Sequence, residues 1–206
     1  MVLAYAIIFL IILAVLFRRD LSALGQISYR GGWKFAGAVL GLFILQAVTV
    51  IYAPGQTILQ IVILTSSQIA LIFLFLFNHH VPGAKLFAVG IALNVLVMVA
   101  NGGWMPVTPE TSHFVHPDRP IVEQTRASSS KNIILPRSET NLWILSDIIR
   151  VTLPWRRNAV SIGDVLLIMA VAQFIFQTTA KKKDKLLASQ VQRLARFQKG
   201  GDQGDY

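Results

Sequence analysis

The sequence predicts an all-α integral membrane protein, a bundle of five transmembrane helices with its N-terminus outside and its C-terminus in the cytoplasm. Of the 206 residues, 54% are apolar and 14% are charged, whereas a soluble domain has ~25% charged residues. The apolar residues gather in blocks of about 15 to 20 with almost no charge inside, as in helices that cross a bilayer. This composition excludes a water-soluble globular fold.

Five segments are apolar enough to cross a bilayer: 2–17, 35–53, 58–77, 84–100 and 160–179. Backbone amides inside lipid must find partners within their own segment, so each segment is predicted to be an α-helix. The first covers about 24 Å of the ~30 Å hydrocarbon core, so we expect Arg18 and Arg19 to snorkel. It lacks the flanks of a cleaved signal peptide, so we expect it to stay in the chain.

The basic residues determine the predicted orientation. With five spans, 12 of the 19 lysines and arginines fall on the side of the C-terminus, and the other seven are spread through the long segment 101–159. Cytoplasmic loops carry the excess of bases in multi-pass proteins. We therefore predict a multi-pass protein of the bacterial cytoplasmic (inner) membrane, with 101–159 as an outer loop.

The polar residues inside the spans are neutral. Gln46, Gln68, Asn94 and Gln173 are examples, and no ionisable residue falls in the central third of any span. Amide side chains at this depth form hydrogen bonds between helices or line a polar cavity. Ion-coupled carriers generally need ionisable groups there, so the pattern argues against ion-coupled transport. Gly37-x-x-x-Gly41 predicts a face for close helix packing.

The edges of the last two spans carry the candidate ligand-binding residues. Asn101-Gly102-Gly103 follows span four, where such residues end helices. In Ser161-Ile162-Gly163-Asp164, Ser161 can cap span five while Asp164 reaches back to the cap amide. These structural roles are one interpretation. The other is a polar site at the outer interface, which we predict from Asn94, Asn101, Gly102, Gly103, Asp147 and Asp164.

These edges also resemble a known family. The run 90–106, the segment 142–154 and Ser161-Ile162-Gly163-Asp164 are together similar to a family of small bacterial membrane proteins catalogued as a domain of unknown function, the 5317 family. The resemblance covers most of the chain up to about Gln177. It implies a multi-helix membrane protein with the Asn-Gly-Gly and Gly-Asp elements at the ends of its last two spans, and it implies no activity.

Within the outer loop, apolar residues at three- and four-residue spacing predict an interfacial helix near 139–152. The preceding stretch, 111–131, is predicted to be extended because it has few apolar residues. It contains His113-x-x-His116-x-Asp118, but Pro117 interrupts the cluster, so we expect no metal site. We also expect no cofactor.

The residues 181–206 form a predicted basic cytoplasmic tail. Its membrane-surface cluster consists of Lys181, Lys182, Lys183 and Lys185. Such a cluster attracts anionic lipid. The chain lacks the aromatic residues interleaved on a basic face that nucleic-acid binding needs, so we expect no nucleic-acid partner. The expected partners are the lipid bilayer, anionic lipid at the tail, and other membrane protein subunits.

Three functions remain compatible with the sequence. The first is a non-enzymatic accessory or scaffold subunit, or a binder of a small or lipidic ligand at the outer face. The second is an interfacial enzyme acting on a lipid or lipid-linked substrate through Asp147 and Asp164, with His113 or His116 as a further candidate. The third is a facilitative transporter lined by the neutral amides. The chain has no cysteine, which excludes thiolate chemistry.

Overall fold

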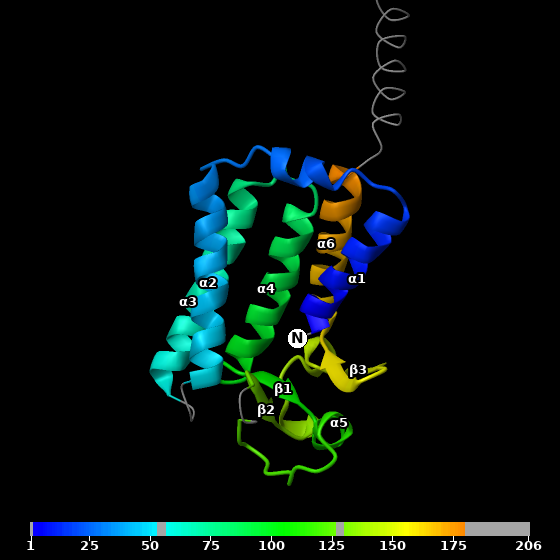
Figure 1. Ribbon diagram of the computed structural model, residues 1–206. Helices are drawn as coiled ribbons and strands as arrows, with labels where there is room; N and C mark the ends of the chain where they lie inside the picture. The colour runs from blue at the N-terminus through cyan, green and yellow to red at the C-terminus, as the bar shows by residue number, and fades with distance from the viewer. Residues whose placement is uncertain (1, 53–56, 127–129, 180–206) are drawn as a thin grey trace, which may run out of the picture.

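Five long α-helices run side by side, each antiparallel to the long helix before it in the chain, and short strands and helices close one end of them (Figure 1). The computed structural model describes residues 2–52, 57–126 and 130–179. The long helices are α1 (Val2–Leu16), α2 (Trp33–Tyr52), α3 (Ile58–Phe77), α4 (Ala84–Ala100) and α6 (Ile162–Thr178). Each occupies one of the five predicted segments, with ends that differ from the prediction by two residues at most.

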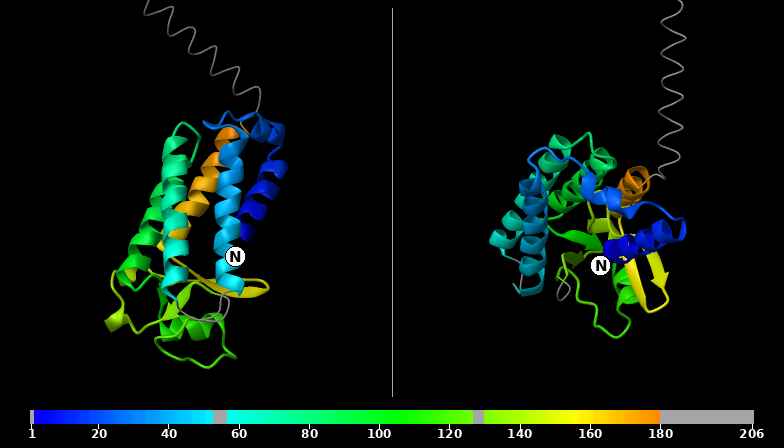
Figure 2. Two further views of the ribbon diagram at one scale, coloured as in Figure 1. Left: turned by 90° about the vertical axis from the view of Figure 1, so that its left-hand side faces the viewer. Right: turned by 45° about the horizontal axis from the view of Figure 1, so that its top comes forward.

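The helices form a row that bends into an arc. α2 packs against α3, α3 against α4, α4 against α6, and α6 against α1. α1 and α2 are therefore the two ends of the row, and α4 is seen between them in Figure 1; Figure 2 gives two further views. The inner side of the arc is the side on which the candidate site lies.

The contact between α4 and α6 is the closest in the arc. A Cβ atom added at Gly163 would lie 2.7 Å from the carbonyl oxygen of Gly90 and would overlap Oδ1 of Asn94. A Cβ atom at Gly83 would overlap the backbone of Ala170. Hydrogen in place of a side chain at these positions lets the two backbones approach each other.

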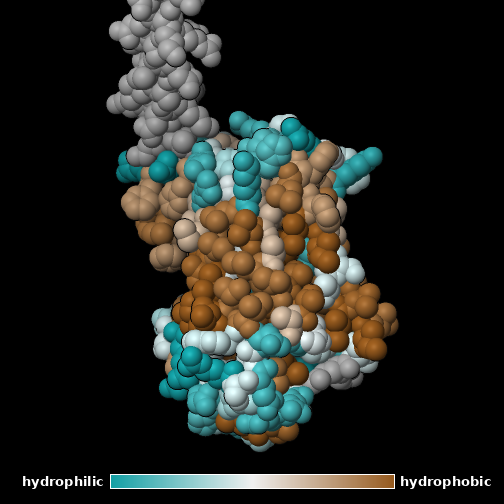
Figure 3. Space-filling view, turned by 180° about the vertical axis from the view of Figure 1, so that it is seen from behind, coloured by the Kyte–Doolittle hydropathy of each residue, from teal (hydrophilic) through white to brown (hydrophobic). Residues whose placement is uncertain are grey.

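The outer surface of the helices is apolar. α2 and α3, of 20 residues each, are long and apolar enough to cross a membrane, and most of each helix is not buried in the molecule. α1, α4 and α6 are shorter apolar helices. A brown, hydrophobic belt lies between hydrophilic ends in Figure 3. Since soluble proteins rarely expose such an extended apolar surface, α2 and α3 are candidate membrane spans.

The end of the bundle is closed by residues 101–126 and 130–161, which we call the cap. β1 (Met105–Val107) pairs in parallel with β2 (Asn132–Ile134), and β3 (Ile149–Leu153) pairs antiparallel with β4 (Arg156–Val160). The remaining short elements are helix α5 (Pro109–Val115) and the 3-10 turns η1 (Leu21–Gln26, before α2), η2 (Arg137–Glu139) and η3 (Trp143–Leu145). The molecule is mostly helical, and these strands correct the all-α prediction.

The predicted interfacial helix near 139–152 is wrong. This stretch contains the end of η2, then η3, and then the first strand of the β3–β4 hairpin. Leu142 has a left-handed backbone with φ of 54°, which interrupts helical geometry. From Ile149 the chain is rich in β-branched residues, which favour a strand. Pro154 lies in the turn between β3 and β4. The helical spacing of the apolar residues arose from a turn followed by a strand.

Three smaller expectations have different outcomes. α5 lies partly within 111–131, which was predicted to be extended, because Thr108 accepts a hydrogen bond from the Thr111 amide and starts a helix. Cβ atoms at Gly37 and Gly41 would meet nothing within 4 Å among the described residues, so this pair does not pack within the arc. The basic tail 181–206 lies outside the described residues.

Replacement of Gly163 by Ala tests the α4–α6 contact. The added methyl group would displace Asn94 and the Gly90 backbone, at a cost of about 1–3 kcal/mol. We expect a lower melting temperature in detergent for Gly163→Ala. The matched control is Gly37→Ala, which has open space and should melt like the wild type or slightly higher. Equal melting temperatures for the two variants would contradict close packing at Gly163.

Candidate functional site

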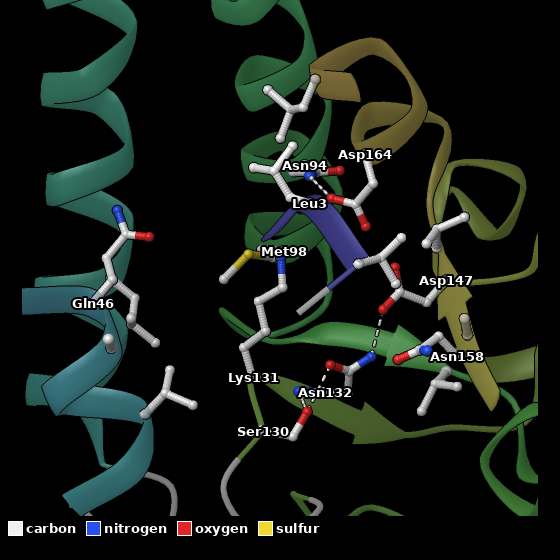
Figure 4. A pocket seen from close by; sticks show the side chains of 18 of the residues that line it. Leu3, Gln46, Asn94, Met98, Ser130, Lys131, Asn132, Asp147, Asn158 and Asp164 are labelled. Carbon is white, nitrogen blue, oxygen red and sulfur yellow. Dashed lines mark hydrogen bonds between the residues drawn. The ribbon is translucent and has the colours of Figure 1, made fainter. Parts of the chain in front are cut away.

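A cavity of about 800 Å³ lies on the inner side of the arc, between the helices and the cap (Figure 4). All five long helices contribute to its walls. The helix side is mainly apolar, and its larger residues are Phe43, Leu71, Phe87, Ile91 and Leu167. The cap side is polar and charged. The cavity therefore has an apolar wall formed by the helices and a polar floor formed by the cap. The polar floor includes Lys131, Asn132, Asp147 and Asn158.

Asp164 stands at the beginning of α6, inside a closed hydrogen-bond network. Its Oδ1 accepts from Nδ2 of Asn94 at 3.0 Å, and its Oδ2 accepts from the Ser161 amide at 3.3 Å. The Ser161 hydroxyl donates to Oδ1 of Asn94 at 2.8 Å and accepts from the Asp164 amide at 3.0 Å. The predicted cap of Ser161 and Asp164 is confirmed. Both carboxylate oxygens are occupied, so Asp164 holds α4 and α6 together while it lines the cavity.

Asp147 is the less satisfied of the two carboxyl groups. It lies between η3 and β3 and is 4% exposed. Its Oδ2 accepts from Nδ2 of Asn132 at 2.6 Å, whereas its buried Oδ1 has no hydrogen-bond partner in the described part of the chain. Burial raises the pKa of Asp147 to about 7, Lys131 opposes that rise and Asp164 adds to it. Burial therefore favours the protonated form of this carboxyl group far more than that of an exposed aspartate.

Two further buried polar atoms on the cavity wall share this condition. Nε2 of Gln46 on α2 and Nδ2 of Asn158 on β4 have no hydrogen-bond partner within the described residues. A buried polar atom without a partner costs about 1–3 kcal/mol, and native proteins contain few of them. Their location around one cavity indicates a place where a polar group can bind.

Cationic side chains surround the polar floor. Lys131, the residue directly before β2, extends into the cavity (Figure 4). Arg119, which follows α5, and Arg156, at the start of β4, also line it. Burial, and then the guanidinium groups of Arg119 and Arg156, lower the pKa of His116. Both effects favour the neutral form of the His116 imidazole.

The structure brings together three of the six predicted ligand-binding residues. Asn94, Asp147 and Asp164 line the cavity. Asn101, Gly102 and Gly103 are not among its lining residues.

Asn101 joins the end of α4 to the cap. Its Nδ2 donates to the carbonyl oxygens of Val97 and Asn141, and its Oδ1 accepts from the Asn141 amide. Gly102 and Gly103 adopt φ of 70° and 89°, which turns the chain out of the helix. The side-chain atoms of Asn101 are thus engaged in a helix-ending role.

The glutamines that the sequence analysis placed inside the spans do not all reach the cavity. Gln46 and Gln68 line the cavity, whereas Gln173 is exposed on α6. Among the described residues, no group of three or more histidine, aspartate or glutamate side chains is arranged to hold a metal ion. Sequence reasoning missed Lys131, Asn132 and Asn158, because isolated polar residues in a loop or strand carry no periodic signal.

Comparison with known proteins agrees with the resemblance in the sequence. The model of a family described as "Family of unknown function (DUF5317)" matches residues 26–176. A protein of Thermotoga maritima named "Uncharacterized protein" is 32% identical over 150 residues, which are 72% of this chain and 74% of that protein. No solved structure matches.

Replacement of Asp164 by Ala tests the closed network. It would leave Nδ2 of Asn94 and the Ser161 amide without their acceptor, at a cost of about 2 kcal/mol. We expect a lower folded yield and a melting temperature reduced by several degrees. Asp118→Ala removes an exposed carboxylate outside the cavity and serves as the control. An unchanged melting temperature in Asp164→Ala would show that the network contributes little.

The pH dependence of stability tests Asp147. Its pKa of about 7 lies above the ordinary value of 3.8, so the folded protein holds this proton more tightly than the unfolded chain does. The wild type therefore loses stability as pH rises from about 4 to about 7, and the loss is complete above pH 7. In Asp147→Asn the amide oxygen can still accept from Asn132, and this loss is absent.

We expect the melting temperature of Asp147→Asn, relative to the wild type, to rise between pH 5 and pH 8. Thermal unfolding in one detergent at both pH values measures the difference. Parallel curves for the two proteins would mean that Asp147 titrates alike in the folded and unfolded states.

Proposed function

The chain belongs to the DUF5317 family of unknown function, and from this premise we propose that it is a multi-pass membrane protein that binds an amphiphilic ligand at its outer face. The observation that carries the proposal is the cavity, which combines apolar helix walls with polar atoms that have no hydrogen-bond partner in the described part of the chain. Its volume of about 800 Å³ lies within the usual range for ligand sites. An amphiphile would fill both parts, whereas a purely polar solute would leave the apolar wall uncovered.

In this proposal all five helices cross the bacterial cytoplasmic membrane. The helices lie side by side, so a bilayer that receives α2 and α3 also receives the other three. α1, α4 and α6 have 15, 17 and 17 residues, somewhat short for the hydrocarbon core, and local thinning of the bilayer would accommodate them.

The bases support an orientation with the cap outside. Arg18, Arg19, Arg30, Lys34 and Lys85 lie at the bundle end opposite the cap. The positive-inside rule places this end in the cytoplasm, and with it the end of α6 that leads into the tail. The cavity then opens at the depth of the outer leaflet and its headgroups.

Interfacial catalysis on a lipid or lipid-linked substrate is a second candidate function. The observation that favours it is Asp147, a buried carboxyl group with a pKa of about 7, whose Oδ1 has no hydrogen-bond partner among residues 2–52, 57–126 and 130–179. Groups with such a pKa can exchange protons at neutral pH. In that case Asp147→Asn would retain the bound ligand and lose turnover, whereas a pure binding protein has no turnover to lose.

Filling the cavity tests the proposed binding. Ala47 on α2 lines the cavity, while Ile44 on the same helix is 54% exposed and does not. The full chain and the variants Ala47→Trp and Ile44→Trp are purified in mild detergent, and the retained amphiphiles are identified by mass spectrometry. We expect a defined amphiphile in the wild type and in Ile44→Trp, and several-fold less of it in Ala47→Trp.

Two results would contradict binding in the cavity. One is a wild-type preparation whose lipids match the bulk membrane composition. The other is equal retention by both tryptophan variants, provided that both melt cooperatively.

A further inference from the structure

The geometry points to a phosphate-bearing amphiphile, whose phosphate lies among Lys131, Arg119 and Arg156 and whose chains leave the cavity between α1 and α2. This inference rests on the proposed function, and it adds the chemical class of the headgroup and the route of the chains.

The charge of the polar floor favours an anionic headgroup. Three cations from separate parts of the cap line the same cavity as Asp147 and Asp164. Asp164 already receives two hydrogen bonds, and its charge lies against the start of a helix. Lys131 is half-buried, so its charge needs an anion more than an exposed lysine does.

The unpartnered atoms favour a ligand that accepts hydrogen bonds. Nε2 of Gln46 and Nδ2 of Asn158 can only donate. Phosphate oxygens only accept when ionised, and guanidinium and ammonium groups are their usual partners in proteins. The third such atom on the cavity wall, Oδ1 of Asp147, also has no hydrogen-bond partner among the described residues. When this carboxyl group holds its proton, it donates to an anionic oxygen and does not repel it.

The ends of the arc provide the route for the chains. Leu3 on α1 and Phe43 and Ala47 on α2 all line the cavity, although these helices stand at opposite ends of the row. Both helices also expose apolar side chains on the outside, such as Phe9 and Ile44. The cavity wall is therefore continuous with surface that faces lipid in the proposed orientation. An acyl chain can extend from the cavity into the bilayer without crossing a polar barrier.

Three probes separate the headgroup from the chains. Dioleoylphosphatidic acid has both chains and phosphate, dioleoylglycerol has the chains alone, and glycerol 3-phosphate has the phosphate alone. Each is titrated into the delipidated full chain in detergent, with native mass spectrometry for the lipids and thermal shift for all three probes. We expect phosphatidic acid to bind at least about ten-fold more tightly than either of the other probes.

Charge variants locate the phosphate. Lys131→Gln should weaken the binding of phosphatidic acid about ten-fold and leave that of dioleoylglycerol unchanged, while Lys131→Arg should retain it. Lys85→Gln, at the opposite end of α4, is the matched control and should bind like the wild type. If Lys131→Gln fails to fold, Arg119→Gln replaces it, because Arg119 is exposed.

The outcomes distinguish this inference from the proposed function. Equal binding of phosphatidic acid and dioleoylglycerol, or an equal effect of Lys131→Gln and Lys85→Gln, overturns the phosphate assignment and leaves amphiphile binding intact. Tight binding of glycerol 3-phosphate alone overturns the lipid source of the phosphate. Failure of both lipids to bind refutes the proposed function, and this inference with it.

Discussion

The hydrogen-bond network of Asn94, Ser161 and Asp164 joins the two central helices at the level of the cavity. Glycines on α4 and α6 bring the backbones close, and this network satisfies the polar atoms that the contact buries. In a weakly polar environment an unpaired amide or carboxylate would be costly, so the three groups hold a single arrangement. Because Ser161 directly follows β4, the same network attaches the cap to the helices.

The two aspartates consequently differ in role. Asp164 is committed to the helix contact, since each of its oxygens already accepts a hydrogen bond. Asp147 is buried on the facing wall and keeps one oxygen without a partner in the described residues. Desolvation, and not a strong charge partner, governs its protonation. A fully hydrogen-bonded carboxyl group and a partly satisfied one thus share one cavity.

The cap also fastens the far end of the arc. Arg126 donates to the carbonyl oxygen of Val50 near the end of α2 at 2.6 Å, and its guanidinium group lies over the ring of Trp104 at 5.0 Å. At the other end of the row, Tyr5 on α1 contacts Trp155 in the β3–β4 hairpin. The cap therefore contacts both end helices of the row, α1 and α2. The two helices between which the ligand's chains are proposed to leave the cavity are therefore both held by the cap.

The sequence by itself determined the five helices and their local ends, because these depend on composition and on contacts within about four residues. Ser161 and Asp164 were predicted as a cap for this reason. Asn94, Asp147 and Asp164 were predicted to share a site, although Asn94 lies inside a span, Asp147 in the loop and Asp164 at the start of the last span. Only the tertiary structure decided that 149–160 forms a hairpin, that Asn101 serves the end of α4, and that Asn132 and Lys131 meet Asp147. The contacts of Asn101 with Asn141 and of Asn132 with Asp147 join residues far apart along the chain, so no local period encodes them. Within 149–160 the apolar residues fit helical spacing as well as a strand, and only the pairing of β3 with β4 decided between the two.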